Sequence, residues 1–157
     1  MALSEQMPGG TGSETGDEVT TPDDTTPLAA GDVIELIVPA LSTYLGVVRT
    51  ATAGLAARLS FTFDEIEDLR IAVDEACVMV LSLPAAKATG DQMLTCRFRV
   101  LPDALTVTVS APVHTTAVLP GEQSFAWEVL TAHASSASGS IIGGNASVGL
   151  RKARKIT

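Results

Sequence analysis

The strongest constraint on the fold is a pair of alternating runs that follow one another almost directly. DQMLTCRFRV (91–100) and ALTVTVSAPV (104–113) each alternate apolar and polar residues, and only Leu101-Pro102-Asp103 separates them. A period of two is typical of a strand with one buried face, and Pro and Asp favour the turn of a hairpin. The chain is therefore expected to contain an antiparallel sheet, with helices covering one face.

Two further segments have the pattern of strands. DVIELIVPA (32–40) alternates and is expected to end at Pro39, because proline cannot donate to a sheet ladder. GSIIGG (139–144) and ASVGLRKAR (146–154) predict a second hairpin that turns at Gly143-Gly144-Asn145. Residues 111–121 have no periodicity, contain two prolines and a glycine, and are expected to form a loop.

Three segments have helical periodicity. In 41–60 the apolar spacing predicts one inward face and Ser42 is a candidate cap; in 61–83 Thr62 precedes an acidic first turn, and Pro84 follows the helix. A short helix over 122–134 is expected to turn Phe125, Val129 and Ala132 inward. The predicted inward residues of the first two helices are Leu41, Leu45, Val48, Thr52, Leu55 and Leu59, then Ile66, Leu69, Val73, Ala76, Cys77 and Val80.

The resulting order, β-α-α-β-β-loop-α-β-β, predicts an α+β two-layer sandwich with a mostly antiparallel sheet and the helices on one face. We expect a single domain over residues 32–157. Residues 1–31 are rich in Thr, Gly, Pro and acidic residues, so they are expected to be a disordered acidic tail.

The net charge of −8 is concentrated at the start of the chain. Residues 1–32 carry seven acidic residues and no Lys or Arg, which leaves −1 for the remainder. A near-neutral folded part argues against a general nucleic-acid binder, which needs a basic surface. Neither a signal peptide nor an apolar run of membrane length is visible, so we expect neither direct nucleic-acid binding nor a membrane protein.

Three motifs point to a known family. In order along residues 33–153, PALSTYLGVVR, DLRIAVDEAC and SFAWEVLTAHA resemble the anti-sigma factors and serine-protein kinases of the RsbW type, especially divergent actinobacterial-type members. The resemblance implies the histidine-kinase-like ATPase fold. It also implies a role in transcription regulation, in which a sigma factor is sequestered and a STAS-domain antagonist counters that binding.

The resemblance implies a nucleotide site on the second helix. The family places there a glutamate, which acts as base or orients water, and four residues later an asparagine that holds Mg²⁺ on the phosphates of ATP. The matching positions are Glu75 and Met79. A thioether is a poor ligand for a hard cation, so Glu75 is a vestigial catalytic candidate, and binding of ATP and Mg²⁺ is in doubt.

Two other nucleotide-binding motifs of the family are weakened. Its Asp-x-Gly-x-Gly segment corresponds to Ala111, Pro112 and Val113, and its glycine-rich lid end reads LPGEQSFAW, with Gly121 as the only glycine. The first hypothesis is therefore an anti-sigma factor without robust kinase activity. The alternatives are an active serine-protein kinase of a STAS antagonist and a non-catalytic ATPase-like interaction domain. Without the resemblance, an acidic pair such as Asp74 and Glu75 on a helix is most often a solvated face.

The resemblance also implies partner surfaces. Arg49 occupies the position of an arginine that contacts the sigma factor, although a solvated helix arginine fits the same pattern. Members of this type pair through the sheet and the first helix, so a cytoplasmic homodimer is expected. The basic residues near the end, Arg151, Lys152, Arg154 and Lys155, are consistent with a solvated strand end, an acidic partner or the chain's own acidic tail.

The remaining reactive residues indicate no additional chemistry. Cys77 and Cys96 are expected to be buried, reduced thiols. His114 and His133 lack cysteines at ligand spacing, so no metal site is predicted. Trp127 is expected to anchor the core, with a binding platform as the alternative.

Overall fold

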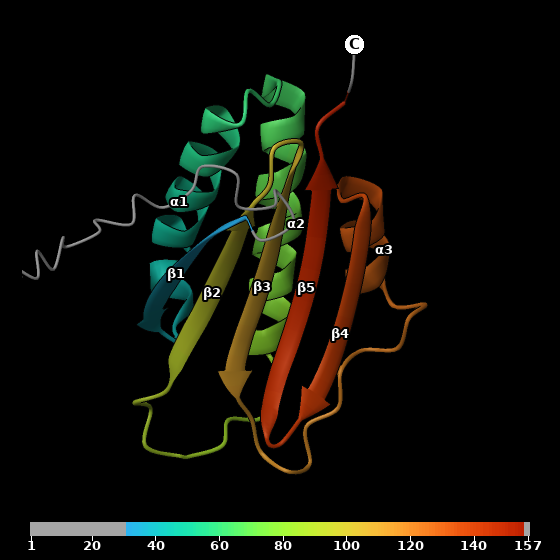
Figure 1. Cartoon of the computed structure of the whole chain (residues 1–157). Coiled ribbons are helices and arrows are strands. Elements are labelled where there is room, and N and C mark those ends of the chain that lie inside the picture. The colour runs from blue at the N-terminus through green and yellow to red at the C-terminus, as the bar shows by residue number, and fades with distance from the viewer. Residues whose placement is uncertain (1–30, 156–157) are drawn as a thin grey trace, which may run out of the picture.

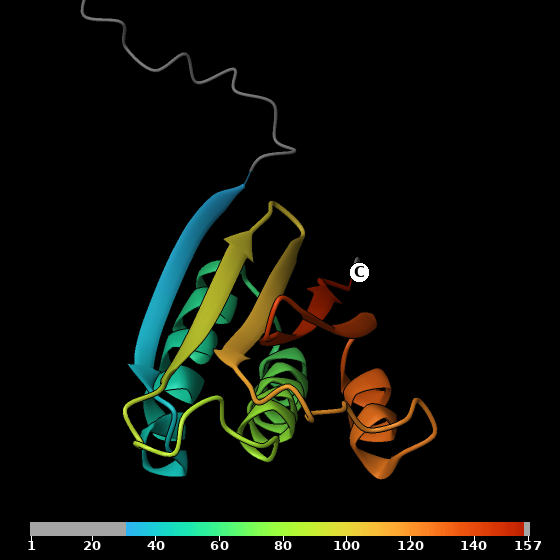
Figure 2. The same cartoon turned by 90° about the horizontal axis from the view of Figure 1, so that it is seen from below.

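The computed structural model describes residues 31–155, which form a five-stranded sheet with helices on one side (Figures 1 and 2). The prediction of a disordered tail over 1–31 lies outside the described residues except for Gly31. The elements are β1 (Asp32–Pro39), the 3-10 helix η1 (Ser42–Tyr44), α1 (Leu45–Arg58), α2 (Phe63–Leu81), β2 (Met93–Val100), β3 (Ala104–Pro112), α3 (Phe125–His133), β4 (Ser136–Ile142) and β5 (Asn145–Ala153).

The sheet has the strand order β1-β2-β3-β5-β4, and every neighbouring pair is antiparallel. The two predicted hairpins, β2–β3 and β4–β5, are confirmed. In the second turn Gly143 and Gly144 both have positive φ (60° and 75°), a conformation that a side chain makes costly. The predicted order of elements and the two-layer α+β architecture are therefore confirmed.

The core lies between the sheet and the three helices. Figure 2 shows α1, α2 and α3 on the same side, so no helix of residues 31–155 covers the other face of the sheet. The strands alternate accordingly: along β2, Leu94, Cys96 and Phe98 are buried while Arg97 and Arg99 are exposed. In α2, Leu69 and Val73 are completely buried, which confirms the predicted stripe. Burial of this stripe is the main force that fixes α2 on the sheet.

Two details at the start of the first helix differ from prediction. The chain makes a 3-10 turn before α1, so Leu41 is outside the helical register and is 51% exposed rather than inward. Ser42 does not cap α1 with its side chain; its backbone carbonyl accepts the N–H of Leu45 instead. The 3-10 turn replaces a side-chain cap here, because it already provides a partner for one of the first helical N–H groups.

The inward face of α3 was predicted wrongly. Phe125 is 75% exposed and Ala132 is exposed, whereas Trp127 and Leu130 are buried. The indole Nε1 of Trp127 donates to the Pro120 carbonyl at 2.7 Å, and its ring packs on β4 at Gly139, where a Cβ would lie 2.9 Å from the ring. This packing fixes the rotation of α3 and confirms Trp127 as a core anchor.

Candidate functional site

The candidate site lies on α2, whose start is fixed by a capping box. The Thr62 side chain accepts the N–H of Glu65 at 3.2 Å, and the Glu65 carboxylate accepts the N–H of Thr62 at 2.7 Å. Glu65 is 1% exposed and also accepts the N–H of Lys155 at 2.6 Å. Burial alone would raise the pKa of Glu65, but these backbone donors outweigh it and lower that pKa. This cap fixes where α2 begins, and therefore which side of the helix each later residue of α2 occupies.

One line along α2 faces α3. Asp68, Ala72, Glu75 and Met79 are three or four residues apart, so they share a side of the helix. Asp68 fixes the direction of that side, because its Oδ1 lies 2.9 Å from Nδ1 of His133 in α3. Ala72 is completely buried, Met79 is 3% exposed, and Glu75 is half-buried between them.

The contact between α2 and α3 is reinforced by a lysine of β5. Nζ of Lys152 donates to Asp68 and to the His133 carbonyl, both at 3.2 Å, and Lys152 is 8% exposed. The hydrogen bond to His133, followed by the contacts with Lys152, lowers the pKa of Asp68 despite partial burial. Residues 68, 133 and 152 are too far apart in sequence for any spacing rule to have linked them.

Asp74 and Arg49 join α2 to α1. Nε of Arg49 lies 2.7 Å from both carboxylate oxygens of Asp74, and the two side chains are 42% and 35% exposed. Asp74 is therefore paired rather than simply solvated, and Arg49 is held in place while it still reaches solvent. The role of Arg49 in partner binding stays a prediction.

A shallow depression surrounds Arg49 on the helical side of the molecule. It has a volume of about 340 Å³ and is lined by Gly46, Arg49, Thr50 and Ala53 of α1 and by Arg70 of α2. The small α1 residues open this depression, and two guanidinium groups line it, of which Arg49 is paired with Asp74. Arg70 also pairs with Glu67 at 2.6 Å. This geometry is suited to an acidic side chain on a partner.

The positions after β3 that the family resemblance assigns to nucleotide binding are apolar and packed. Ala111 is 6% exposed and Val113 is 4% exposed. The N–H of Val113 donates to Gly144, the N–H of His114 donates to Pro84, and Val113 pairs with Ala85. The segment after β3 is thus tied both to the segment after α2 and to the β4–β5 turn.

These residues do not fit a magnesium–nucleotide complex. Met79 offers no oxygen ligand, and Ala111 and Val113 can neither recognise an adenine amino group nor approach phosphate as glycines can. Within residues 31–155, no group of three or more His, Cys, Asp or Glu side chains could hold a metal ion.

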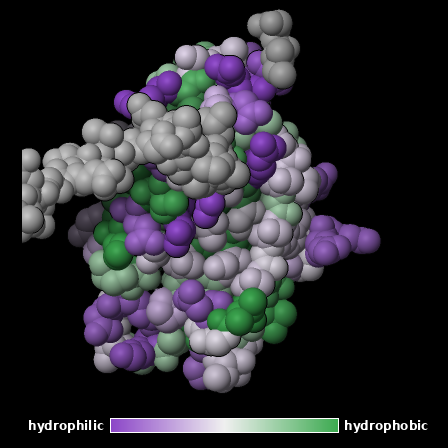
Figure 3. All heavy atoms as spheres, viewed as in Figure 1, coloured by the Kyte–Doolittle hydropathy of each residue, from purple (hydrophilic) through white to green (hydrophobic). Residues whose placement is uncertain are grey.

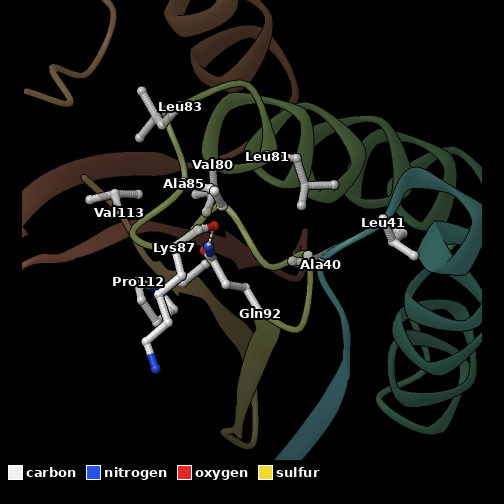
Figure 4. Close-up of a pocket in the computed structure, with 13 residues that line it drawn as sticks. Ala40, Leu41, Val80, Leu81, Leu83, Ala85, Lys87, Gln92, Pro112 and Val113 are labelled. Atoms are coloured by element: carbon white, nitrogen blue, oxygen red, sulfur yellow. Dashed lines mark hydrogen bonds between the residues drawn. The ribbon is translucent and has the colours of Figure 1, made fainter.

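Two cavities border this region without including Glu75 or Met79. The first, about 250 Å³, lies beside the end of α2, and Figure 4 shows its walls formed from Ala40, Val80, Leu83 and Val113 among others. Gln92 there donates to the Lys87 carbonyl at 2.7 Å. The second, about 490 Å³, lies between α3 and β4 and includes Trp127 and Thr131. Both are partly open and mainly apolar.

The two cysteines contact each other inside the core. Cys77 of α2 and Cys96 of β2 are both completely buried and unbridged, which confirms them as buried thiols. Their hydrogen bond raises the pKa of Cys77, and burial raises it further; the same bond lowers the pKa of Cys96. No described helix is both long and apolar enough to cross a membrane.

Comparison with known proteins supports the resemblance. No protein-family model matches the chain. The serine-protein kinase RsbW of Bacillus subtilis is 43% identical over 79 residues, which is 50% of this chain and 49% of that protein. The same-named kinase of Halalkalibacterium halodurans is 52% identical over 50 residues, 32% of this chain and 31% of that protein. The chain thus spans at most about half the length of these curated relatives.

A solved structure has the same fold. The crystal structure of the RsbU and RsbW domains of a Mycobacterium tuberculosis protein superposes with a TM-score of 0.59 at 15% identity, covering 80% of this chain and 34% of that one. At this identity the likeness concerns the fold. The predicted histidine-kinase-like ATPase fold and the predicted similarity to RsbW proteins are therefore both confirmed.

Proposed function

We propose that this protein is an anti-sigma regulatory factor that acts by binding, without robust kinase activity. The similarity to RsbW kinases over half the chain supports the regulatory role. The observation that carries the binding-only mechanism is the burial of Met79, Ala111 and Val113, at 3%, 6% and 4% exposed, where the family resemblance implies polar nucleotide contacts. Such a factor acts in the bacterial cytoplasm, where sigma factors and RNA polymerase meet.

Without phosphorylation, competition between partners has to set the regulatory output. A sigma factor and a STAS-domain antagonist compete for overlapping surfaces, and the ratio of their concentrations and affinities decides which one is held. We place the acidic contact of the sigma factor at the depression around Arg49 and Arg70. Arg49 is fixed by Asp74 before the partner arrives, so less side-chain entropy is lost on binding.

The homodimer implied by the resemblance is best supported along β1 and α1. β1 is an edge strand, and Ile34 and Ile37 in it are 41% and 55% exposed. Tyr44 and Val47, at the adjoining start of α1, are 39% and 48% exposed. An unprotected edge with exposed apolar side chains is a surface that a second copy can cover.

Two titrations test the proposal. The 157-residue chain is titrated calorimetrically with ATP and magnesium, and separately with purified sigma factors of the source bacterium, one at a time. We expect saturable binding of one sigma factor in the absence of nucleotide, and no ATP heat. Saturable ATP binding followed by phosphate transfer to a STAS protein would instead establish the kinase alternative, which the retained Glu75 and the kinase relatives favour.

Arg49→Glu tests the proposed contact. It should weaken sigma binding by about tenfold or more, because a fixed charge is reversed at the interface. Arg58→Glu is the matched control, since Arg58 is also an exposed arginine of α1 but lies at its far end. Equal affinity for the two variants would remove Arg49 from the interface.

A further inference from the structure

Across β2, β3, β5 and β4, the face of the sheet that carries no helices is mostly polar and positively charged, with exposed apolar residues at its margins such as Met93 and Ile142. Arg97 and Arg99 of β2 and Arg151 of β5 point away from the helices, and hydroxyl side chains lie between them. Figure 3 looks onto this face, whose visible part is mostly purple and pale with some green patches. Among the described residues, the outward positions of β2, β3, β5 and β4 carry no Asp or Glu. We call this surface the open face.

The arginines of the open face are arranged in register. Thr106 of β3 pairs with Arg99 on one side and with Arg151 on the other, so the two arginines flank it in a single row. With strands about 4.8 Å apart, their Cα atoms are about 10 Å from each other. In the next row Thr108 pairs with Arg97 and with Gly149.

A shallow hollow lies beside this row. It has a volume of about 340 Å³, and its lining includes Thr106, Thr108, Ser138, Gly149 and Arg151. Gly149 has no side chain to fill the space, and the hydroxyl groups supply hydrogen-bond donors next to a guanidinium. Such a hollow is suited to a carboxylate, which accepts several hydrogen bonds and needs a nearby cation. Glu35, in the edge strand β1, forms an ion pair with Arg97 at 3.5 Å. It is the only acid among the outward-facing residues of β1.

The acidic segment of the chain joins the folded part at this end of the sheet. Asp32 pairs with Val100 and Val33 pairs with Arg99, so the described chain begins beside Arg99, directly after residues 1–30 in the sequence. That segment has six acidic residues and no Lys, Arg or His. Its nearest acids, Asp23 and Asp24, are nine and eight residues before Asp32, so an extended chain lets them reach up to about 30 Å from it. The sheet is about 19 Å wide from β1 to β4, so these acids can reach any strand of the open face.

We propose that the acidic segment 1–30 binds the open face of the same chain, with its carboxylates at Arg97, Arg99 and Arg151. Covalent attachment gives the segment a millimolar effective concentration, so weak individual contacts suffice. The segment then shields the open face, and an acidic partner must displace it to bind there. This inference is independent of the proposed anti-sigma function.

The test uses a spin label on the full chain. Thr20→Cys places one reactive thiol in the segment, while Cys77 and Cys96 are completely buried; the unmutated chain must take up no label. With the spin label in its paramagnetic form, the amide signals of Arg97, Thr108 and Gly149 should have about half or less of the intensity that they have after the label is reduced. Thr50, Ala53 and Ala57 on the helical side serve as controls and should change little.

Charge variants decide whether the contact is the proposed one. Changing all six acids of the segment to Gln or Asn should abolish the broadening, as should salt of about 0.5 M, where the Debye length is only about 4 Å. Arg97→Gln with Arg151→Gln should weaken it, while Arg58→Gln, far from this face, should not. Broadening that is absent, equal on both sides of the molecule, or insensitive to these charges would overturn the proposal.

A mixed sample separates one chain from two. Labelled chains without nitrogen-15 are combined with unlabelled nitrogen-15 chains, so that any broadening must arise between molecules. The proposal predicts none on the open face. Broadening there in the mixed sample, at the strength seen within one chain, would assign the face to the segment of a second copy and overturn binding within the chain.

Discussion

Replacing Met79 with alanine tests whether the position that the family resemblance assigns to nucleotide binding is filled by packing. Met79 is 3% exposed and belongs to the main apolar core. Alanine removes three heavy atoms of a side chain that is almost entirely buried. Such core truncations cost about 2–5 kcal/mol, and the better helix propensity of alanine returns at most a few tenths. We expect Met79→Ala to lower the free energy of unfolding by about 3 kcal/mol.

The assay is urea unfolding followed by the fluorescence of Trp127, the single tryptophan, which is 9% exposed. With a slope of about 2 kcal/mol per molar urea, the expected loss moves the midpoint down by about 1.5 M. Val78→Ala is the matched control, because Val78 is the neighbouring residue but is 45% exposed, and it should cost less than about 1 kcal/mol. If both variants cost the same, Met79 does not fill a packed site, and its burial no longer speaks against nucleotide binding.

Three further changes have expected outcomes. Asp68→Asn should lower the free energy of unfolding by about 1 kcal/mol near neutral pH. Contacts with His133 and Lys152 lower the pKa of Asp68 in the folded state, so the stabilisation by Asp68 is present above the pKa of the unfolded chain and is lost as the pH falls through the folded pKa. Urea unfolding at stepwise lower pH measures this loss. Cys77 and Cys96 should not react with an aromatic disulfide reagent until the protein unfolds, and fast labelling of the native protein would contradict their burial. Gly54→Ala, in an exposed position of α1 with no atom near the added methyl group, should raise the thermal midpoint, whereas Gly144→Ala, at φ 75°, should lower it; equal shifts would refute the backbone argument.

Local sequence rules predict the elements of this fold because each element carries its own signal. The alternation in β2 and β3, the Thr62–Glu65 capping box and the paired glycines of the β4–β5 turn all act within a few residues. The hairpins fix β2 beside β3 and β4 beside β5, whereas the pairings of β1 with β2 and of β3 with β5 join segments that are distant in sequence. The local preferences match the folded structure because burial and backbone hydrogen bonding favour the same conformation.

Rotation of α3 is the clearest case in which local rules fail. The nine-residue helix is largely apolar, so several faces satisfy the same periodicity. The contacts that decide between them come from Pro120 before the helix and Gly139 after it, through Trp127. Large aromatic side chains bury the most area, so α3 adopts the rotation that buries the indole of Trp127 and leaves Phe125 exposed.

The candidate site shows the same division between local and distant information. Sequence alone places Glu75 and Met79 on one side of α2, because helical spacing is local. It does not show that Asp74 is bound by Arg49, 25 residues earlier, or that Asp68 is bound by His133, 65 residues later. These pairs change the meaning of the acidic residues on α2: Asp68 and Asp74 hold α2 to its neighbouring helices. Of the acids in the DLRIAVDEA segment, Glu75 alone forms no side-chain hydrogen bond or ion pair within the described residues, and it shares its side of α2 with the buried thioether of Met79 rather than with an oxygen ligand for a metal. A carboxylate in that setting can orient water or accept a hydrogen bond from a partner, but it has no second ligand with which to hold magnesium. Because Ala111 and Val113 are apolar as well, a substitution at Met79 alone would not create a nucleotide site.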